Sequence, residues 1–287
     1  MILVLITWLI NGFLVSFVYA LIAAMFHINI IHSPDWLILG YLSITLFMLL
    51  GISKAGHFLI KMYLGCRFAI SRERQQVNPF LDQVLKSCNQ KFQTNYQVDK
   101  VQIMIMDSKV PDSQAVGFNT IILTDGLLKN ATDEELKAVL AYEVGHLYNR
   151  DSVVFGAAIF GNIAARFIMW LNSKYVFCFK FIMANARIFG NKGFHLLPVL
   201  AIIPLVIFFP IVIINFIIKH VFGVSVYMIN RNYVYKADKF AKELGFGPGL
   251  ISYLETLQEI TYVDKSILGR IFATYPSAMK RIGNLEQ

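Results

Sequence analysis

Long apolar stretches alternate with mixed sequence along this chain. Residues 1–26 and 36–52 form two apolar runs, and the loop between them, residues 27–35, contains no lysine or arginine. Two further apolar segments cover residues 153–170 and 196–218. Because a helix of about 20 apolar residues crosses the hydrocarbon core of a bilayer, this pattern predicts four α-helical membrane segments.

The mixed sequence after the second apolar run predicts a compact α+β unit over residues 75–151. Apolar residues at helical spacing follow Pro79, where we expect a helix to begin. Residues 101–105 alternate as a strand, and residues 120–124 form a second strand.

A second part of the pattern predicts two longer helices. The capping box Thr132-Asp133-Glu134-Glu135 precedes an expected helix over residues 136–150. Another helix is expected at about residues 224–244, where a glycine-rich segment ends it. The predicted organisation is two transmembrane helices, the first half of a cytoplasmic domain, a membrane hairpin with a basic loop, and the second half of that domain, at residues 1–52, 53–151, 152–218 and 219–287.

Composition supports a membrane protein. The 287 residues are 56% hydrophobic and 15% charged, whereas soluble domains carry about 25% charged residues. The net charge of +8 comes mostly from basic residues beside the apolar segments, where anionic lipid headgroups attract them. This distribution favours a lipid bilayer and argues against nucleic acid as the partner.

The positions of the basic residues also indicate orientation. Lysines and arginines follow the second apolar run, so the positive-inside rule places the next soluble region in the cytoplasm. A hairpin of the third and fourth segments conflicts with this rule, because it would put Lys174, Lys180 and Arg187 on the far side. The alternative is that only one of these segments spans the membrane.

The segment Tyr142-Glu143-Val144-Gly145-His146 carries the most specific chemistry, in the middle of an expected helix. In the pattern H-E-x-x-H, two histidines one helical turn apart bind zinc, and the glutamate is the general base for zinc-bound water. Here a tyrosine occupies the first histidine position. Tyr142 and His146 share a helix face, and Glu143 points to nearly the same side.

Residues 139–147, followed by Arg150 and Asp151, resemble the zinc helix of the HtpX-type membrane metallopeptidases, relatives of the CAAX prenyl protease. The resemblance implies an α+β zincin-like metallopeptidase domain combined with four α-helical membrane segments, mainly α overall. It also implies a multi-pass zinc endopeptidase of the bacterial inner (cytoplasmic) membrane, with its soluble domain facing the cytoplasm. In that family Glu143 would be the general base, His146 a zinc ligand, and Asp151 and Asp238 supporting residues.

Three positions depart from the family pattern. The first ligand is replaced by Tyr142, the third ligand, a glutamate in the family, by Val234, and the histidine of a T-H-P segment by Tyr275. If about 10–16 kcal/mol of zinc binding is shared among four ligands, losing two costs on the order of 5–8 kcal/mol, or roughly four to six decades of affinity. The remaining histidines, His27, His32, His57, His195 and His220, are expected too far away to substitute. We therefore expect zinc to be absent or weakly bound.

Residues 111–117 resemble the family's substrate-binding edge strand. The expected peptide-binding edge consists of Ser113, Gln114, Ala115, Val116 and Gly117. A peptide could add to this edge through backbone hydrogen bonds, which need no metal.

These observations leave three hypotheses for function. The first is an HtpX-like integral membrane pseudoprotease that binds membrane-protein clients or acts as a regulatory component. The second is an active zinc metalloendopeptidase of membrane-protein quality control with substituted ligands. The third is a structural subunit of a membrane complex. Metal content distinguishes the first from the second, and peptide affinity distinguishes the first from the third.

Overall fold

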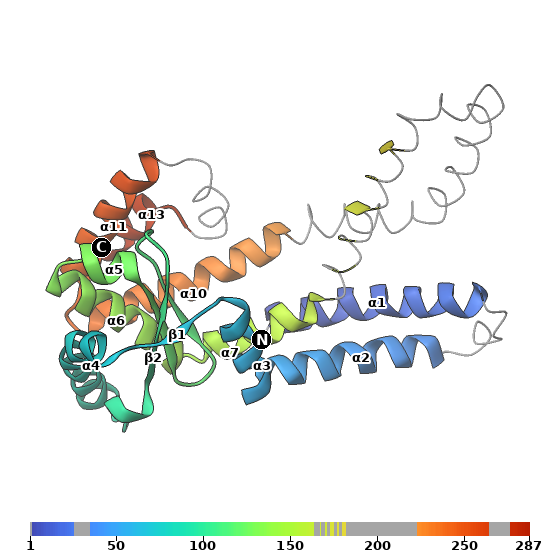
Figure 1. The fold of residues 1–287 in the computed structure, drawn as a ribbon, viewed down its shortest axis with the longest axis horizontal. Coiled ribbons are helices and arrows are strands. Elements are labelled where there is room, and N and C mark those ends of the chain that lie inside the picture. Colours follow the sequence, from blue (N-terminus) through green and yellow to red (C-terminus); the bar gives the residue numbers. More distant parts are fainter. Residues whose placement is uncertain are drawn as a thin grey trace. The chain divides into compact units, whose positions relative to one another are not determined.

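The computed structural model describes residues 2–25, 35–163, 223–263 and 276–287, with a few single positions between 167 and 181 (Figure 1). The chain divides into two compact units, which are described separately. Unit 1 combines residues 1–3, 48–160 and 227–287, and unit 2 combines residues 4–47 and 161–226.

Unit 2 contains most of α1, Ile2–Met25, and of α2, Asp35–Ile52, which run side by side. The indole Nε1 of Trp8 donates to Thr45 Oγ1 at 2.9 Å, and the Trp8 ring contacts Tyr41 at a centroid distance of 4.7 Å. A Cβ atom on Gly40 would lie 2.0 Å from Ser16 Oγ, so glycine is needed for this close helix approach.

The expectation of four membrane segments is only partly met. Among the described residues, Asp35–Ile52 is the single helix long and apolar enough to cross a membrane. Val4–Ala20 and Asp151–Gly161 are apolar but shorter. The fourth predicted segment, residues 196–218, lies outside the described residues, as does part of the third.

The core of unit 1 is a four-stranded sheet with the order β1-β2-β4-β3. Strand β4, Thr120–Thr124, is parallel to β2, Gln102–Met106, and antiparallel to β3, Ser113–Val116. The short strand β1, Arg67–Phe68, pairs antiparallel with β2. Because β4 is internal and apolar, all five of its residues are buried. Strand β3 is an edge strand.

Helices cover this sheet and carry the predicted motif. Unit 1 contains α3 Lys54–Tyr63, α4 Ser71–Phe92, the 3-10 turn η1 Val98–Lys100, α5 Asp125–Asn130, α6 Asp133–Tyr148, α7 Asp151–Gly161, most of α10 Gly223–Glu243, α11 Gly247–Val263 and α13 Ala278–Glu286. Helix α6 contacts α4, β3 and α11, which makes it the centre of the unit.

The start predicted for the helix at Pro79 is wrong, because α4 begins at Ser71 and contains Pro79 in its interior. Two interactions outside the periodic pattern extend the helix. The Glu73 carboxylate accepts from the Ile70 backbone N–H at 2.8 Å and forms two hydrogen bonds with the Arg67 guanidinium. Val77 is also fully buried, so the added turns contribute to the core.

The predicted end of the motif helix at residue 150 is also slightly wrong. Helix α6 ends at Tyr148, and Arg150 has a left-handed backbone with a φ of 57°. This conformation cannot continue a helix and directs the chain into α7.

Candidate functional site

The motif lies on a helix that is firmly fixed at its beginning. Thr132 Oγ1 accepts from the Glu135 N–H at 3.3 Å, and Glu135 Oε2 accepts from the Thr132 N–H at 2.9 Å, which confirms the predicted capping box. Glu135 Oε1 also accepts from Ser252 Oγ at 2.7 Å and thereby joins α6 to α11. Burial raises the pKa of Glu135, but the hydrogen bonds from Thr132, Ser252 and Thr256 outweigh it and hold that pKa below its usual value.

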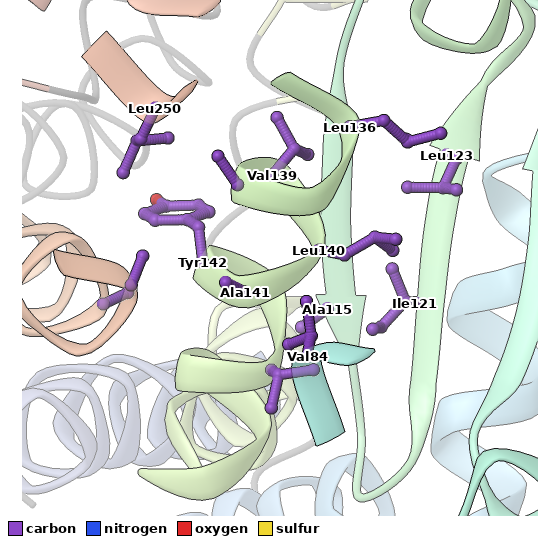
Figure 2. Packing of buried hydrophobic residues seen from close by; sticks show 14 of the residues in the cluster. Val84, Ala115, Ile121, Leu123, Leu136, Val139, Leu140, Ala141, Tyr142 and Leu250 are labelled. Atoms are coloured by element: carbon purple, nitrogen blue, oxygen red, sulfur yellow. The ribbon is translucent and has the colours of Figure 1, made fainter. Parts of the chain in front are cut away.

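Opposite faces of α6 contact different parts of unit 1 (Figure 2). Leu136 and Leu140 point toward Leu123 and Ile121 of the sheet, whereas Tyr142 leaves the other side of the helix toward Leu250 of α11. The side of α6 that carries Tyr142 lines a cavity of about 100 Å³. Its lining includes Asp112, Ser113, Gln114, Ala115, Tyr142, Glu143, His146, Asp151, Val234, Tyr253, Pro276 and Arg281.

Tyr142 and Val234 both belong to the core beside this cavity. Tyr142 is 8% exposed and Val234 is 1% exposed. The Tyr142 ring meets the His146 ring edge-on at a centroid distance of 4.7 Å, and the Arg281 guanidinium carbon lies 4.7 Å from the centre of the Tyr142 ring. The phenol therefore has aromatic and cation–π neighbours, as a packed core residue would.

Arg281 is held beside Tyr142 by a buried ion pair. Its Nη2 and Nε atoms donate to the two carboxylate oxygens of Asp238 at 2.6 and 3.0 Å. Burial lowers the pKa of Arg281, but the charges of Asp238 and Tyr142 and the hydrogen bond to Asp238 more than offset this and raise it. Asp238 thus supports a guanidinium on α13.

His146 has a local partner of its own. Its Nδ1 lies 3.4 Å from Asp151 Oδ2, at the beginning of α7. The two residues are mostly buried, with side-chain exposures of 15% and 9%. The structure therefore brings together the predicted residues His146 and Asp151 as a hydrogen-bonded pair.

The donor atoms around the cavity do not fit a catalytic zinc site. Such a site needs three protein ligands, drawn mainly from histidine, cysteine and carboxylate side chains. Among the residues that the structure describes, no group of three or more His, Cys, Asp or Glu side chains could hold a metal ion. Tyr142 and the hydrocarbon of Val234 stand at two of the three expected ligand positions, and Tyr275 lies outside the described residues.

Glu143 is a fully buried carboxyl group. Ser113 Oγ donates to its Oε1 at 2.6 Å, and the Ala115 backbone N–H donates to the same carboxylate. Its Oε2 has no hydrogen-bond partner in the described part of the chain. Burial raises the pKa of Glu143, and the His146 charge and these hydrogen bonds offset only part of that effect.

Asp112 lies next to Glu143 and is a second carboxyl group with a raised pKa. Burial, together with the nearby charge of Glu143, raises the pKa of Asp112 to about 6, while the hydrogen bond from the Ser113 N–H opposes the shift. Both carboxyls therefore hold protons more tightly than exposed side chains do. This is the expected response of carboxyl groups whose burial outweighs the charges and hydrogen bonds around them.

The predicted peptide-binding edge is β3, and several of its polar groups are already bonded. Asp112 Oδ1 accepts from the Ser113 N–H at 2.8 Å, and Glu143 accepts from the Ala115 N–H. Beyond the strand, Ser152 Oγ donates to the Gly117 carbonyl at 2.5 Å. A peptide adding to this edge would have to displace such bonds.

The edge extends into a tight turn next to α3. Val116 is the last strand residue and is buried in a small apolar cluster with Ile60 and Ile122. Gly117 has a φ of 66°, and a Cβ atom there would lie 2.4 Å from His57 Nδ1. Gln114 is half-buried and lines the cavity.

One contributor to the site, Arg281, was not identified as a functional residue from the sequence, and another, Ser113, was given a different role. Arg281 lies five positions after Pro276, beside the degenerate T-H-P segment, and that proximity is the only signal that could have indicated it. Ser113 was expected to bind peptide, whereas its hydroxyl is bonded to Glu143. This contact joins positions 30 residues apart and leaves no local pattern.

The chain is similar to several known proteins. A solved structure, the crystal structure of S. mikatae Ste24p, aligns over 100% of this chain and 67% of its own length, with 18% identity and a TM-score of 0.49. Among curated proteins, CAAX prenyl protease 1 homolog of Oryza sativa subsp. japonica is 24% identical over 228 residues, which cover 72% of this chain and 50% of the rice protein.

HtpX proteases are also similar. Protease HtpX of Psychrobacter sp. (strain PRwf-1) is 23% identical over 159 residues, which cover 54% of this chain and 52% of that protein. Protease HtpX homolog 2 of Methanosarcina acetivorans is 36% identical over 76 residues, 25% of this chain and 26% of that protein. The matched region thus spans about half the length of these curated relatives, or less. The model of peptidase family M48 matches residues 72–287, and the chain belongs to that family.

Proposed function

We propose that this chain is an M48-family integral membrane pseudoprotease that does not hydrolyse peptides through zinc. It acts instead as a binding or regulatory component of the membrane, with its folded domain on the cytoplasmic side of a bacterial inner membrane. The observation that carries the proposal is the replacement of ligands by packed core: Tyr142 and Val234 are buried beside the cavity, and the remaining imidazole of His146 bonds to Asp151.

The bonding of the cavity's polar groups supports the same proposal. Glu143 is 1% exposed and accepts a hydrogen bond from Ser113. Arg281 occupies the region beside Tyr142 with a charge already neutralised by Asp238.

Metal analysis tests the loss of zinc directly. The full chain would be purified in detergent, exchanged into buffer with one equivalent of zinc, desalted, and measured by elemental mass spectrometry. We expect far less than one zinc per chain, and no difference between wild type and His146→Ala. Near-stoichiometric zinc that disappears in His146→Ala would overturn the proposal and support an active endopeptidase with substituted ligands.

The occupied edge of β3 bears on a second candidate function, that of a structural subunit of a membrane complex. Because the Ser113 and Ala115 N–H groups are bonded within the chain, peptide capture by strand addition is disfavoured relative to a structural role in a membrane complex. Co-purification of a stoichiometric partner with no affinity for unfolded peptides supports the structural role. Micromolar peptide binding that is abolished by Ala115→Pro, which removes an edge N–H, would support client capture instead.

A further inference from the structure

A second cavity in unit 1 shares no lining residue with the first, although Leu147 of the motif helix α6 borders it. It has a volume of about 830 Å³, within the range of small-molecule sites. Helix α3, the segment before β2, and the turn between β3 and β4 line it. Lys54, Lys61 and Lys100 are its basic lining residues, and Asp99 is its acidic one.

The charge of this cavity is positive and unneutralised. Three lysines against one aspartate give a net charge of +2. Among the described residues, no carboxylate lies within 4.0 Å of any of the three ammonium groups, and the Lys61 Nζ donates to the neutral Gln102 side chain at 2.9 Å. Such a cavity suits an anionic group that accepts hydrogen bonds, and phosphate is the common example.

His57 forms the inner part of the lining on α3. It is 6% exposed, and its Nε2 has no hydrogen-bond partner in the described part of the chain. Burial, aided by the charge of Lys61, lowers the pKa of His57, so the imidazole is neutral near pH 7. The positive charge of the cavity therefore comes from the lysines alone.

Helix α3 presents three distinct faces. Gly56, His57 and Ile60 form its buried face. Lys54 and Lys61 are seven residues apart, so they lie within about 20° of each other around the helix axis, next to the buried face.

The third face of α3 is exposed and apolar. Phe58, Leu59, Met62 and Tyr63 are all exposed, and all but Leu59 are more than half exposed, at 61%, 63% and 85%. Lysines therefore separate an apolar face open to the surroundings from the face packed on the domain. This arrangement is typical of helices that lie in a membrane interface, with apolar side chains in the acyl region and lysines among the headgroups.

Helix α3 directly follows the candidate membrane span, which indicates that it lies at the membrane surface. Helix α2 is the candidate membrane span and ends at Ile52, and α3 begins two residues later at Lys54, with Ser53 as its N-cap. A helix that starts within two residues of a membrane span begins at the depth of the lipid headgroups. A soluble anion would explain the lysines but not the exposed apolar face.

We propose that the cavity lined by Lys54, Lys61 and Lys100 binds the phosphodiester headgroup of an anionic phospholipid, with the apolar face of α3 lying against its acyl chains. The site is independent of the cavity lined by Tyr142, Glu143 and His146, and of whether zinc binds there. Val116 lines the cavity proposed for the lipid and Ala115 lines the cavity beside Tyr142, so neighbouring residues of β3 contribute to two separate sites.

The test uses the full chain, purified in detergent and delipidated. Native mass spectrometry would titrate it with dioctanoyl phosphatidylglycerol, with dioctanoyl phosphatidylcholine, and with inorganic phosphate. A lysine near a membrane surface contributes about fivefold to binding of an anionic lipid, so Lys54→Gln/Lys61→Gln/Lys100→Gln is expected to weaken phosphatidylglycerol binding about 100-fold. Equal binding of the two lipids by wild type would overturn the proposal.

Matched variants separate the specific site from general charge. Lys86→Gln/Lys129→Gln/Lys239→Gln removes the same net charge from lysines that pair with helix carboxylates instead, and it is expected to leave phosphatidylglycerol binding within twofold. If this control weakens binding as much as the cavity variant does, attraction to the whole chain explains the result, and the proposed site is wrong.

A second comparison distinguishes a lipid from a free phosphate. Met62→Ser is expected to weaken phosphatidylglycerol binding at least threefold without changing phosphate binding, because it removes an acyl contact only. Met279→Ser, at an equally exposed position of α13, serves as its control. Phosphate binding as tight as that of the lipid, together with no effect of Met62→Ser, would assign the cavity to a soluble anion and refute the lipid.

Discussion

Restoring the two missing ligands provides the sharpest test of the proposed loss of zinc binding. We expect the double variant Tyr142→His/Val234→Glu to bind zinc, whereas each single variant does not. Both side chains line the cavity that His146 lines, so the replacements would direct an imidazole and a carboxylate toward the same space. Each single change leaves only two ligands, one fewer than a catalytic zinc site uses.

The expected gain follows from the contribution of each ligand. If about 10–16 kcal/mol is divided among four ligands, two restored ligands add on the order of 5–8 kcal/mol, or roughly four to six decades of affinity. Without zinc the double variant should be less stable than wild type. Position 234 is 1% exposed, and an unpaired buried charge destabilises by on the order of 3–5 kcal/mol.

The assay combines zinc content with thermal unfolding. Zinc should raise the melting temperature of the double variant and leave wild type, each single variant and the size-matched control Tyr142→Phe/Val234→Gln unchanged, because only a folded state with three ligands binds the ion. A double variant that unfolds cooperatively but does not bind zinc would refute the reasoning. In that case the contacts of Tyr142 with Arg281 reflect a cavity reshaped beyond its ligands.

Three further predictions concern stability. Arg281→Met leaves the Asp238 carboxylate buried without its partner and should lower the free energy of unfolding by about 3–5 kcal/mol, whereas Arg281→Met/Asp238→Leu should recover most of it in a denaturant titration. No recovery in the double variant would contradict the pairing. Because the pKa of Glu135 is lowered on folding, its contribution is present above its unfolded pKa of 4.5 and lost as pH falls through the folded value. The destabilisation by Glu135→Gln should therefore be largest at pH 7 and shrink toward pH 3, and a constant difference would refute it. Gly156→Leu should destabilise by about 1–3 kcal/mol in thermal or denaturant unfolding, because its Cβ would lie 2.7 Å from the Gly51 carbonyl oxygen, and an unchanged variant would disprove that close contact.

Local patterns predicted the parts of this fold that depend on neighbouring residues. The capping box before α6 requires only residues 132–135 and is present as expected. The start of α4 was missed because the turns before Pro79 do not depend on local apolar spacing. The Arg67–Glu73 bonds and the burial of Val77 stabilise these turns. Tertiary contacts override a proline signal when the added turns bury apolar surface.

The candidate site was only partly predictable for a similar reason. The replacement of ligands at Tyr142 and Val234 is visible in the sequence, because it is a departure from a short motif. The partners of the surviving polar groups are not visible. Arg281 and Asp238 are 43 residues apart, and no periodicity connects them. Which hydroxyl or guanidinium reaches a buried carboxylate is decided by the packing of α6, α10 and α13.

These partners explain how the domain can keep its polar residues without an ion. In a zinc enzyme, the metal would offset the cost of burying acidic and imidazole groups around it. Here each group has a protein partner: His146 has Asp151, Glu143 has Ser113, and Asp238 has Arg281. One buried oxygen of Glu143 has no partner among the described residues, and burial raises the pKa of this carboxyl group. Because a buried polar group costs little once it is hydrogen-bonded, the proposed loss of the metal is compatible with a stable fold. Retention of Glu143 and His146 therefore does not require that the chain still hydrolyses peptides.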